Sequence, residues 1–590
     1  MLELLAQASQ AAAIPEPPAA GLGAIIALVL FIAASVWLGT VAQKVVERSK
    51  FIQGYFQGNR GLGAWTIALT ATVQSGGTFM GFPSLVYTFG WSVALWIASY
   101  MVVPITGFGL IGKRIAQISR RTGAVTMPDL FRARYGSPTA GLLSSLLIIV
   151  FMSIMMIAQF KAGALVMKIA WPGSRTLALS EDGPTASPTA GNVAAADEAA
   201  TASDRFWNWL AREQVYLIGL AVFSLTVVGY TLIGGFLAAV WTDLLQSVMM
   251  FLGVMILLCL AIPAVGGLAQ ASRKAIANVE QASLARGETP QQAQQAAVRY
   301  ASLPGQKPDG TPWLPLTMAF SFFCFWPFAG TASPASVVRI MACRDTGVLR
   351  RSMFLLAIYN MGIYLPLIAI CICARAMMPD LGTKSDEVIP RMALTLTHGL
   401  PLGSWMSGLI MAAPFGAIMA TVSSYLLVIA SGLVRDVYQR FVNPQATDHE
   451  MRRLTYLVMI VIGTVAAGLN IVPVDRLQML VTFSSGCAAS AFLIPTVMMC
   501  YWRRATAAGT IGAMLAGALT ALTLNLAGLY VAYRTQTSFA AYMLLGFEPI
   551  VWGLLVSLVV GIIVSLLTRP PDEELVSKLF DAPEPVAEGG

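Results

Sequence analysis

The chain has 590 residues, of which 57% are hydrophobic and only 11% are charged. Because soluble globular domains carry roughly a quarter charged residues, this composition excludes a soluble protein and indicates a polytopic membrane protein. The net charge of +8 comes from basic residues scattered in short connections, which fits membrane topology better than nucleic-acid binding.

Apolar segments of spanning length begin after a short tail at residues 1–20. We predict thirteen transmembrane helices, at approximately 21–43, 64–88, 91–112, 141–170, 214–234, 236–266, 313–341, 352–376, 402–434, 454–472, 477–501, 506–532 and 547–568. Two long polar loops, near 171–213 and 267–312, interrupt this series, and a short acidic tail follows residue 569.

Basic residues gather in alternate connections, near 44–60, 113–134, 339–351, 435–453 and 503–504. Since cytoplasmic connections of membrane proteins are enriched in Lys and Arg, we predict that these connections face the cytoplasm. The N-terminus and both long loops then lie outside and the C-terminus lies inside. The expected location is the plasma membrane, which in bacteria is the inner membrane.

The second apolar segment contains a stretch, Leu69–Pro83, that forms a poor helix. Three glycines and a proline lie among threonines, Ser75 and Gln74, and no charge appears. Glycine and proline weaken a helix, and freed backbone groups at membrane depth are tolerated only where protein or a cavity satisfies them. The stretch is therefore a candidate small-molecule or ion site.

The seventh segment is interrupted in the same way, by Pro327, Gly330 and Pro334 within Phe325–Ala335. Five helices separate the starts of the two broken segments, an odd number, so two halves of the chain would be inverted relative to each other. Two discontinuous helices in corresponding positions indicate a transporter with a binding site near mid-membrane.

Several motifs resemble those of the sodium:solute symporter family, and they occur in that family's order. They are Tyr55–Arg60, the stretch 69–83 with Tyr87 and Trp91 after it, Gly234–Gln246, Val338–Arg339, Ala412–Ser424 and Arg435–Tyr438. Within the family, the Ala412–Pro414 and Val388–Pro390 stretches look most like the pantothenate-permease branch.

The resemblance implies the leucine-transporter-type fold, which is all-α and has two inverted five-helix repeats. Applied to this chain, it places one helix at 21–45, the first repeat at 62–270 and an outer loop at 271–312. The second repeat would cover 313–505, two extra helices 506–569 and a cytoplasmic tail 570–590.

The resemblance also implies a sodium site, because backbone carbonyls freed by a helix break are suitable ligands for a hard cation. The matching positions are Ala71 and Gln74 in the second helix, and Ala417, Ala420 and Thr421 in the ninth. The family usually has serine at position 420, and alanine offers no side-chain oxygen, so Thr421, Ser424 or a water would have to fill the gap. The alternative is that these hydroxyls only bond their own helix backbone.

Two charged residues lie in or beside the membrane. Lys161 in the fourth helix is either a counter-charge for an anionic substrate, or a stand-in for a second cation, or a side chain that snorkels to the outer surface. Asp243 at the inner start of the sixth helix either attracts sodium to the inner vestibule, as the resemblance suggests, or pairs with an arginine such as Arg339. Asp436, beside Arg435, is predicted to be a solvated helix end.

Candidate substrate contacts are the small polar and aromatic residues of the broken helices and of the eleventh helix. They are Ser75, Gly76, Thr78, Lys161, Trp326, Gly330, Ser333, Ser484 and Ser485. Trp326 serves equally well as packing or as an interface anchor.

We therefore predict a secondary active transporter that imports a small organic solute together with sodium by alternating access. A proton-coupled or uncoupled transporter of the same fold is the main alternative. A membrane enzyme, sensor or channel is disfavoured, because the chain has no metal-site or hydrolase motif and only a short tail. We expect no cofactor besides the sodium ion and a protein that functions as a monomer; the solute stays open.

Overall fold

The computed structural model describes residues 17–46, 62–71, 75–171, 202–301, 315–378, 380–471, 477–535 and 540–581. Over these ranges the chain is helical, and its β-type pairing is confined to an isolated bridge between Leu62 and Cys343. The all-α prediction is confirmed.

The first half of the chain contains thirteen described helical segments, of which the last two, α13 and α14, follow the long helix α12. The bounds are α2 Leu22–Val46, α4 Ala64–Ala71, η2 Gly77–Gly81, α5 Phe82–Phe89, η3 Gly90–Val93, α6 Ala94–Pro104, η4 Ile105–Gly112, α7 Lys113–Thr122, α8 Met127–Tyr135, α9 Pro138–Ala170, α12 Ala202–Val265, α13 Leu268–Ala285 and α14 Pro290–Ala301.

The second half follows the same pattern of long helices joined by short ones. The bounds are α15 Leu316–Ala332, α16 Pro334–Met341, α17 Thr346–Met377, η5 Gly382–Glu387, α18 Val388–Thr397, α19 Gly403–Ser431, η6 Gly432–Val442, α20 Asp448–Leu469, α21 Leu477–Tyr501, α22 Ala507–Thr535, η7 Leu544–Gly546, α23 Pro549–Leu567 and α24 Glu573–Phe580.

Nine helices of the described ranges are long and apolar enough to cross a membrane, and the bent pair α15–α16 makes a tenth span. One of the nine, α12, is two helices joined at Gly235, whose backbone (φ 57°, ψ −142°) is not helical. A positive φ is readily adopted only by glycine, which explains why the chain turns at this residue. Each of the thirteen predicted segments falls on one of these helices or on the series α4–α5 and α6–η4.

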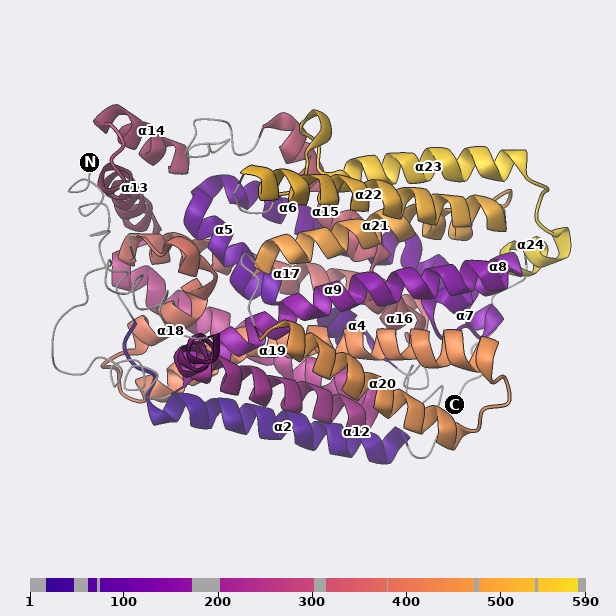
Figure 1. Ribbon diagram of the computed structural model, residues 1–590, viewed down its shortest axis with the longest axis horizontal. Helices are drawn as coiled ribbons and strands as arrows, with labels where there is room; N and C mark the ends of the chain where they lie inside the picture. The colour runs from indigo at the N-terminus through magenta and orange to yellow at the C-terminus, as the bar shows by residue number, and fades with distance from the viewer. Residues whose placement is uncertain are drawn as a thin grey trace.

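The long helices run along the longest axis of the molecule (Figure 1). Helices α13, α14 and α18 lie at one end, here named the α13 end, together with the start of α2. Helices α7, α8 and α24 lie at the opposite end, here named the α8 end. The two ends therefore correspond to the two sides of the membrane.

Helix α19 forms the centre of the bundle, where it packs against α2, α9 and α12. Every residue from Ile410 to Leu427 is buried. The segment is rich in Gly, Ala, Ser and Thr, and in membranes such small residues let neighbouring helices pack closely, which fits a helix at the centre of the bundle. The candidate sodium ligands of α19 therefore lie deep in the protein.

Both predicted helix breaks are present. Helix α4 ends at Ala71, and regular structure resumes at Gly77 as a short π-helix that continues into α5. The second break lies at Ser333, which is extended (φ −63°, ψ 121°), and α15 and α16 meet there at 49°. The sequence also assigned this break to Pro327 and Gly330, which is wrong, because α15 continues through both residues. Pro334 is responsible, since proline disfavours helical geometry in the residue before it.

Candidate functional site

A cavity of about 310 Å³ lies beside the first helix break, and we name it the central cavity. Its lining comes from five parts of the chain that are far apart in sequence. The lining residues are Ser75, Gly77, Thr78, Phe82, Tyr100, Trp326, Tyr364 and Gln478. Of the predicted substrate contacts, this lining includes Ser75, Thr78 and Trp326.

The polar side of the central cavity is built from the break itself. The amide of Gly77 donates to Oγ of Ser75 at 3.1 Å, and the amide of Ser75 donates to Oγ1 of Thr78 at 3.4 Å. The Thr78 hydroxyl also pairs with the Tyr364 hydroxyl at 3.2 Å. Short hydroxyl side chains thus satisfy amide groups that the interrupted helix leaves without a helical partner.

The other side of the central cavity is aromatic. The Tyr100 ring centroid lies 4.4 Å from that of Tyr364 and 4.9 Å from that of Trp326. The Phe82 ring meets Tyr364 edge-on at 5.9 Å. Sequence reasoning missed Phe82, Tyr100, Tyr364 and Gln478, because aromatic and polar residues in apolar helices look like packing until the helices are placed together.

Gly76 lies next to this cavity but faces away from it. A Cβ at this position would lie 2.9 Å from Ala162 and 3.3 Å from Ile418, so Gly76 is wedged between α9 and α19. Its amide donates to Oε1 of Gln159 at 2.8 Å. Gln159 is fully buried, and its Nε2 has no hydrogen-bond partner among the described residues.

The remaining predicted substrate contacts lie outside the lining of the central cavity. Gly330 packs against Val103 of α6, at 2.8 Å from where a Cβ would be. The Ser484 hydroxyl donates to the carbonyl of Phe151 on α9 at 2.5 Å. Ser333 and Ser485 are half-buried, the former at the second break.

The structure describes the α19 side of the candidate sodium site and the end of α4. The Thr421 hydroxyl donates to the carbonyl of Ala417 at 3.0 Å, so these two residues share one helix face as their spacing predicts. Ala71 is the last residue of α4, and Gln74 lies outside the described residues. Groups of three or more His, Cys, Asp or Glu side chains suited to a metal are absent from the described ranges.

Ser424, one of the predicted replacements for the oxygen that Ala420 lacks, makes two hydrogen bonds. Its hydroxyl donates to the carbonyl of Ala420 at 2.7 Å and accepts from Nη2 of Arg339 at 2.6 Å. The donated bond uses the hydroxyl hydrogen and the accepted bond uses one of the two lone pairs of the oxygen. Thr421, Ser424 and water therefore all stay predictions for the ligand that Ala420 lacks.

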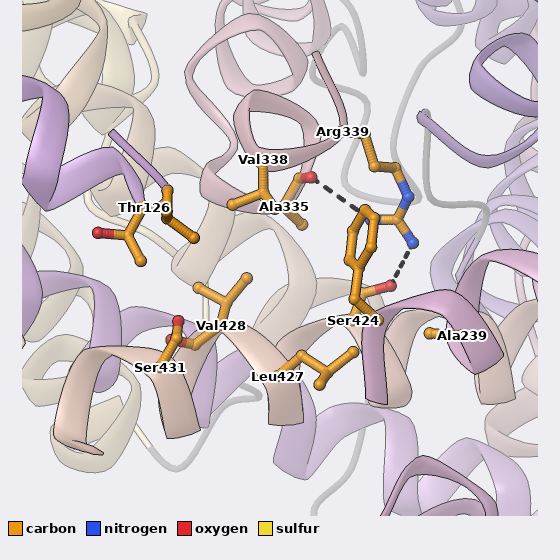
Figure 2. A pocket seen from close by; sticks show the side chains of 11 residues that line it. Thr126, Ala239, Ala335, Val338, Arg339, Ser424, Leu427, Val428 and Ser431 are labelled. Atoms are coloured by element: carbon orange, nitrogen blue, oxygen red, sulfur yellow. Dashed lines mark hydrogen bonds between the residues drawn. The ribbon is translucent and has the colours of Figure 1, made fainter. Parts of the chain in front are cut away.

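Asp243 forms a buried ion pair with Arg339, as one of its two predicted roles requires. The Nη2 atom of Arg339 lies 2.5 Å from Oδ2 of Asp243, and both side chains are 3% exposed. Figure 2 shows Arg339 reaching Ser424 and the carbonyl of Ala335 beside a second cavity, of about 380 Å³, which is also lined by Thr126 and Ser431. The pair joins α12, α16 and α19 on the α8 side of the central cavity.

Asp436 is only 3% exposed, so the prediction that it is a solvated helix end is wrong. It accepts a hydrogen bond from the Thr126 hydroxyl at 3.1 Å. Next to it, Asp129 of α8 pairs with Arg435 at 3.0 Å and with Arg440. This cluster ties α8 to η6 at the α8 end.

Lys161 is half-buried on α9 and interacts electrostatically with Asp386 of η5. Burial raises the pKa of the Asp386 carboxyl above its ordinary value, and the Lys161 ammonium opposes that shift. The neighbouring Ser385 accepts a hydrogen bond from Ser84 of α5 at 2.7 Å. Lys161 is thus absent from the lining of the central cavity and lies within electrostatic range of a protein carboxylate.

Comparison with known proteins gives consistent matches over most of the chain. The sequence model of the sodium:solute symporter family matches residues 55–180 and 213–517. The sodium/pantothenate symporter of Haemophilus influenzae is 28% identical over 516 residues, which cover 84% of this chain and 89% of that protein. The osmoregulated proline transporter of Bacillus subtilis is 25% identical over 554 residues, covering 93% and 95%.

One solved structure shows the same fold. It is a Na⁺-coupled sialic acid symporter in a substrate-bound, outward-open state, with a TM-score of 0.64 and 19% sequence identity. The match covers 94% of this chain and 99% of that chain.

Proposed function

Because the chain belongs to the sodium:solute symporter family, we propose that its central cavity binds a small solute that carries a carboxylate. The protein is a multi-pass membrane transporter that couples the movement of sodium to the import of a small organic solute. Members of its family named for pantothenate and for proline are among its relatives, and both of these solutes carry a carboxylate.

The observation that carries this proposal is the lining of the central cavity. Its polar side offers the hydroxyls of Ser75, Thr78 and Tyr364 and the amide of Gln478, and its lining contains no charged side chain. A carboxylate there would be held by hydrogen bonds and by the charge of the nearby sodium ion.

The aromatic side of the cavity supports a solute with an apolar part. Tyr100, Trp326 and Tyr364 form a continuous wall that would contact methyl and methylene groups. Such walls give binding through apolar burial, while the few polar groups fix orientation. Pantothenate, which has both a branched apolar portion and hydroxyl, amide and carboxylate groups, matches this arrangement better than proline.

Sodium would lie between the end of α4 and α19. The ligands in this proposal are the carbonyls of Ala71, Gln74 and Ala417 and the hydroxyl of Thr421, with water in the place of the oxygen that Ala420 lacks. The ion would hold the broken helix against α19 and so favour the arrangement of Ser75 and Thr78 that binds the solute. Such coupling is reciprocal, so the solute would raise sodium affinity by the same factor.

We assign the α13 end to the outside and the α8 end to the cytoplasm, in line with the distribution of basic residues. The N-terminus would then be outside, the C-terminus inside, and the bacterial inner membrane the location. In this orientation the Asp243–Arg339 pair is part of the barrier that closes the cytoplasmic side while the solute binds. The repeats 62–270 and 313–505 would move relative to each other to open it.

The test is uptake of radiolabelled pantothenate and proline into proteoliposomes that contain the purified protein. An inward sodium gradient should drive accumulation, and replacing sodium by choline should abolish it. Tyr364→Phe removes a cavity hydroxyl and should reduce uptake, whereas Tyr216→Phe, whose hydroxyl donates to Asn470 on another face, should not. Undiminished uptake in choline would refute sodium coupling, and the absence of uptake of both solutes would refute the proposed substrate class.

A further inference from the structure

A separate cavity of about 820 Å³ lies at the α13 end, between α5, α13, α14, α17 and η5. We name it the α13-end cavity. Two of its walls are the helices that also line the central cavity. Helix α5 contributes Phe82 to the central cavity and Tyr87 to the α13-end cavity. Helix α17 contributes Tyr364 to the central cavity and Arg375 to the α13-end cavity. Tyr364 and Arg375 are separated by three helical turns, or about 16 Å.

The lining of the α13-end cavity is positively charged. It contains Arg286, Arg299 and Arg375 against the two carboxylates of Glu288 and Asp380, so it carries one net positive charge. The central cavity contains no charged side chain, so the two sites differ in how they would attract an anion. A cavity lined by one excess sign of charge raises the local concentration of the opposite ion.

Arg375 is the most constrained of the three arginines. Its residue is 6% exposed, its Nη1 donates to the Tyr87 hydroxyl at 3.1 Å, and its guanidinium lies over the Tyr87 ring at 4.9 Å. The nearest carboxylate oxygen, on Asp380, is 3.8 Å from Nη1. Nε has no hydrogen-bond partner among the described residues. The guanidinium is therefore held through Nη1, while its buried Nε–H is left unpaired, and a bound anion could accept from it.

Tyr300 presents a second buried group without a partner. The residue is 4% exposed, and its hydroxyl makes no hydrogen bond within the described ranges. Burial raises the pKa of this hydroxyl, so it is a hydrogen-bond donor at all physiological pH values, and Arg375 acts on it electrostatically. The lining of this cavity therefore includes two residues, Arg375 and Tyr300, that each have a buried donor without an acceptor among the described residues.

The walls of this cavity are fixed rather than loosely placed. Gly90 has φ +72°, and a Cβ there would lie 2.2 Å from the carbonyl of Tyr300, so only glycine lets α14 approach this closely. Nε1 of Trp91 donates to Ser272 at 3.2 Å, and Nδ2 of Asn278 donates to the carbonyl of Arg375 at 3.0 Å. These contacts anchor α13 and α14 to the helices that carry Tyr87 and Arg375.

We infer that the α13-end cavity is a second binding site for the carboxylate-bearing solute, with Arg375 and Tyr300 as donors to the carboxylate. The identity of the ligand class rests on the proposed function. The site would capture the anion on the outer side and pass it along α5 and α17 to the central cavity. None of the proposed sodium ligands lies in this lining, so binding here requires no sodium.

The experiment uses the purified full-length protein and equilibrium dialysis with radiolabelled pantothenate in sodium-free choline buffer. The wild type should bind one pantothenate per chain, and pantothenol, in which a hydroxymethyl group replaces the carboxylate, should not compete. Tyr300→Phe removes only a hydroxyl without a partner, so its fold should be retained, and it should weaken binding at least about tenfold. Arg375→Gln should weaken it further. Tyr135→Phe, which removes a buried hydroxyl at the α8 end, is the matched control and should bind as the wild type does.

The inference is overturned if the wild type binds no pantothenate without sodium, if pantothenol competes equally, or if Tyr300→Phe and Arg375→Gln both bind normally. Failure of the proposed function would look different. It would appear as an absence of sodium-driven uptake while choline-buffer binding persists. Tyr364→Phe separates the two sites, because it should lower sodium-dependent uptake and leave binding in choline unchanged.

Discussion

The backbone amide of Gly76 donates a 2.8 Å hydrogen bond to the side-chain oxygen of Gln159, which lies on a different helix, α9. The amide belongs to the interrupted part of the α4–α5 segment, and in a membrane an unpaired amide has no water to bond. Gln159 thus supplies the hydrogen-bond acceptor that the interrupted helix does not offer to the Gly76 amide. The same contact places α9 directly behind the residues that line the central cavity.

Replacing Gln159 by methionine should therefore damage the break. Methionine keeps the length of the side chain but offers no strong acceptor, so the Gly76 amide would be left buried and unpaired at a cost of about 1–3 kcal/mol. We expect a lower thermal midpoint and reduced sodium-driven uptake. Thr496→Ala, which removes a buried hydroxyl that bonds only its own helix, is the control. Wild-type uptake by Gln159→Met would remove this contact from the mechanism.

Thr421→Ala should raise the sodium concentration that gives half-maximal uptake by about three- to tenfold, which corresponds to about 0.7–1.4 kcal/mol of lost ion binding. The hydroxyl lies one turn from the carbonyl of Ala417, on the same face. Thr455→Ala removes an equally buried hydroxyl from α20 and should leave sodium dependence unchanged. A Thr421→Ala protein with unaltered sodium dependence would exclude Thr421 as a ligand.

Asp243→Asn and Arg339→Gln should each destabilise the protein by about 3 kcal/mol, because either change leaves one buried partner without its counter-charge. The double variant removes both charges and should recover much of that loss. Thermal unfolding of the purified variants measures the effect. If the losses of the two single variants simply added in the double variant, the ion pair would not be the source of the stability.

Lys161→Met should alter the pH dependence of stability through Asp386. Burial holds the pKa of this carboxyl above its ordinary value, so its contribution to stability is present at low pH and is lost as pH rises through the raised pKa. Removing the Lys161 ammonium, which lowers that pKa, should enlarge the loss and extend it to higher pH. The thermal midpoint of Lys161→Met, measured from pH 4 to pH 8, should fall more than that of the wild type.

The double variant Lys161→Met/Asp386→Asn provides the control for this prediction, because the group that titrates is absent. Its thermal midpoint should lose the additional pH dependence. If the single and double variants followed the same pH curve, Asp386 would not be the group that Lys161 acts on.

Much of the fold was predictable because the signals are local. Glycine and proline in uncharged apolar segments predicted the two helix breaks. The length of each apolar segment predicted each membrane-spanning helix. Of the three residues predicted to break the seventh segment, only Pro334 does so, because α15 continues through Pro327 and Gly330 although both weaken a helix. Local propensity identifies where a helix is weak, but packing decides where it bends.

The candidate site was only partly predictable because its partners come from distant segments. Ser75 and Thr78 were identified from the break itself. The contributions of Tyr100, Gln159 and Tyr364 to the site were missed. The sequence of an apolar helix does not show whether a single polar residue bonds its own backbone or a neighbouring helix. The role of Lys161 could not be decided from sequence because its partner, Asp386, lies in a connection on the other half of the chain.

The turn at Gly235 has a consequence for genetics. A residue other than glycine at position 235 would have to adopt a positive φ. A Cβ at the preceding Gly234 would lie 2.4 Å from the Cβ of Ala238 and 2.6 Å from the carbonyl oxygen of Gly39. Trimming Ala238 would remove the first of these clashes but not the clash with the backbone of α2. A screen for revertants of a Gly234 or Gly235 mutation should therefore return restored glycines and no compensating changes elsewhere.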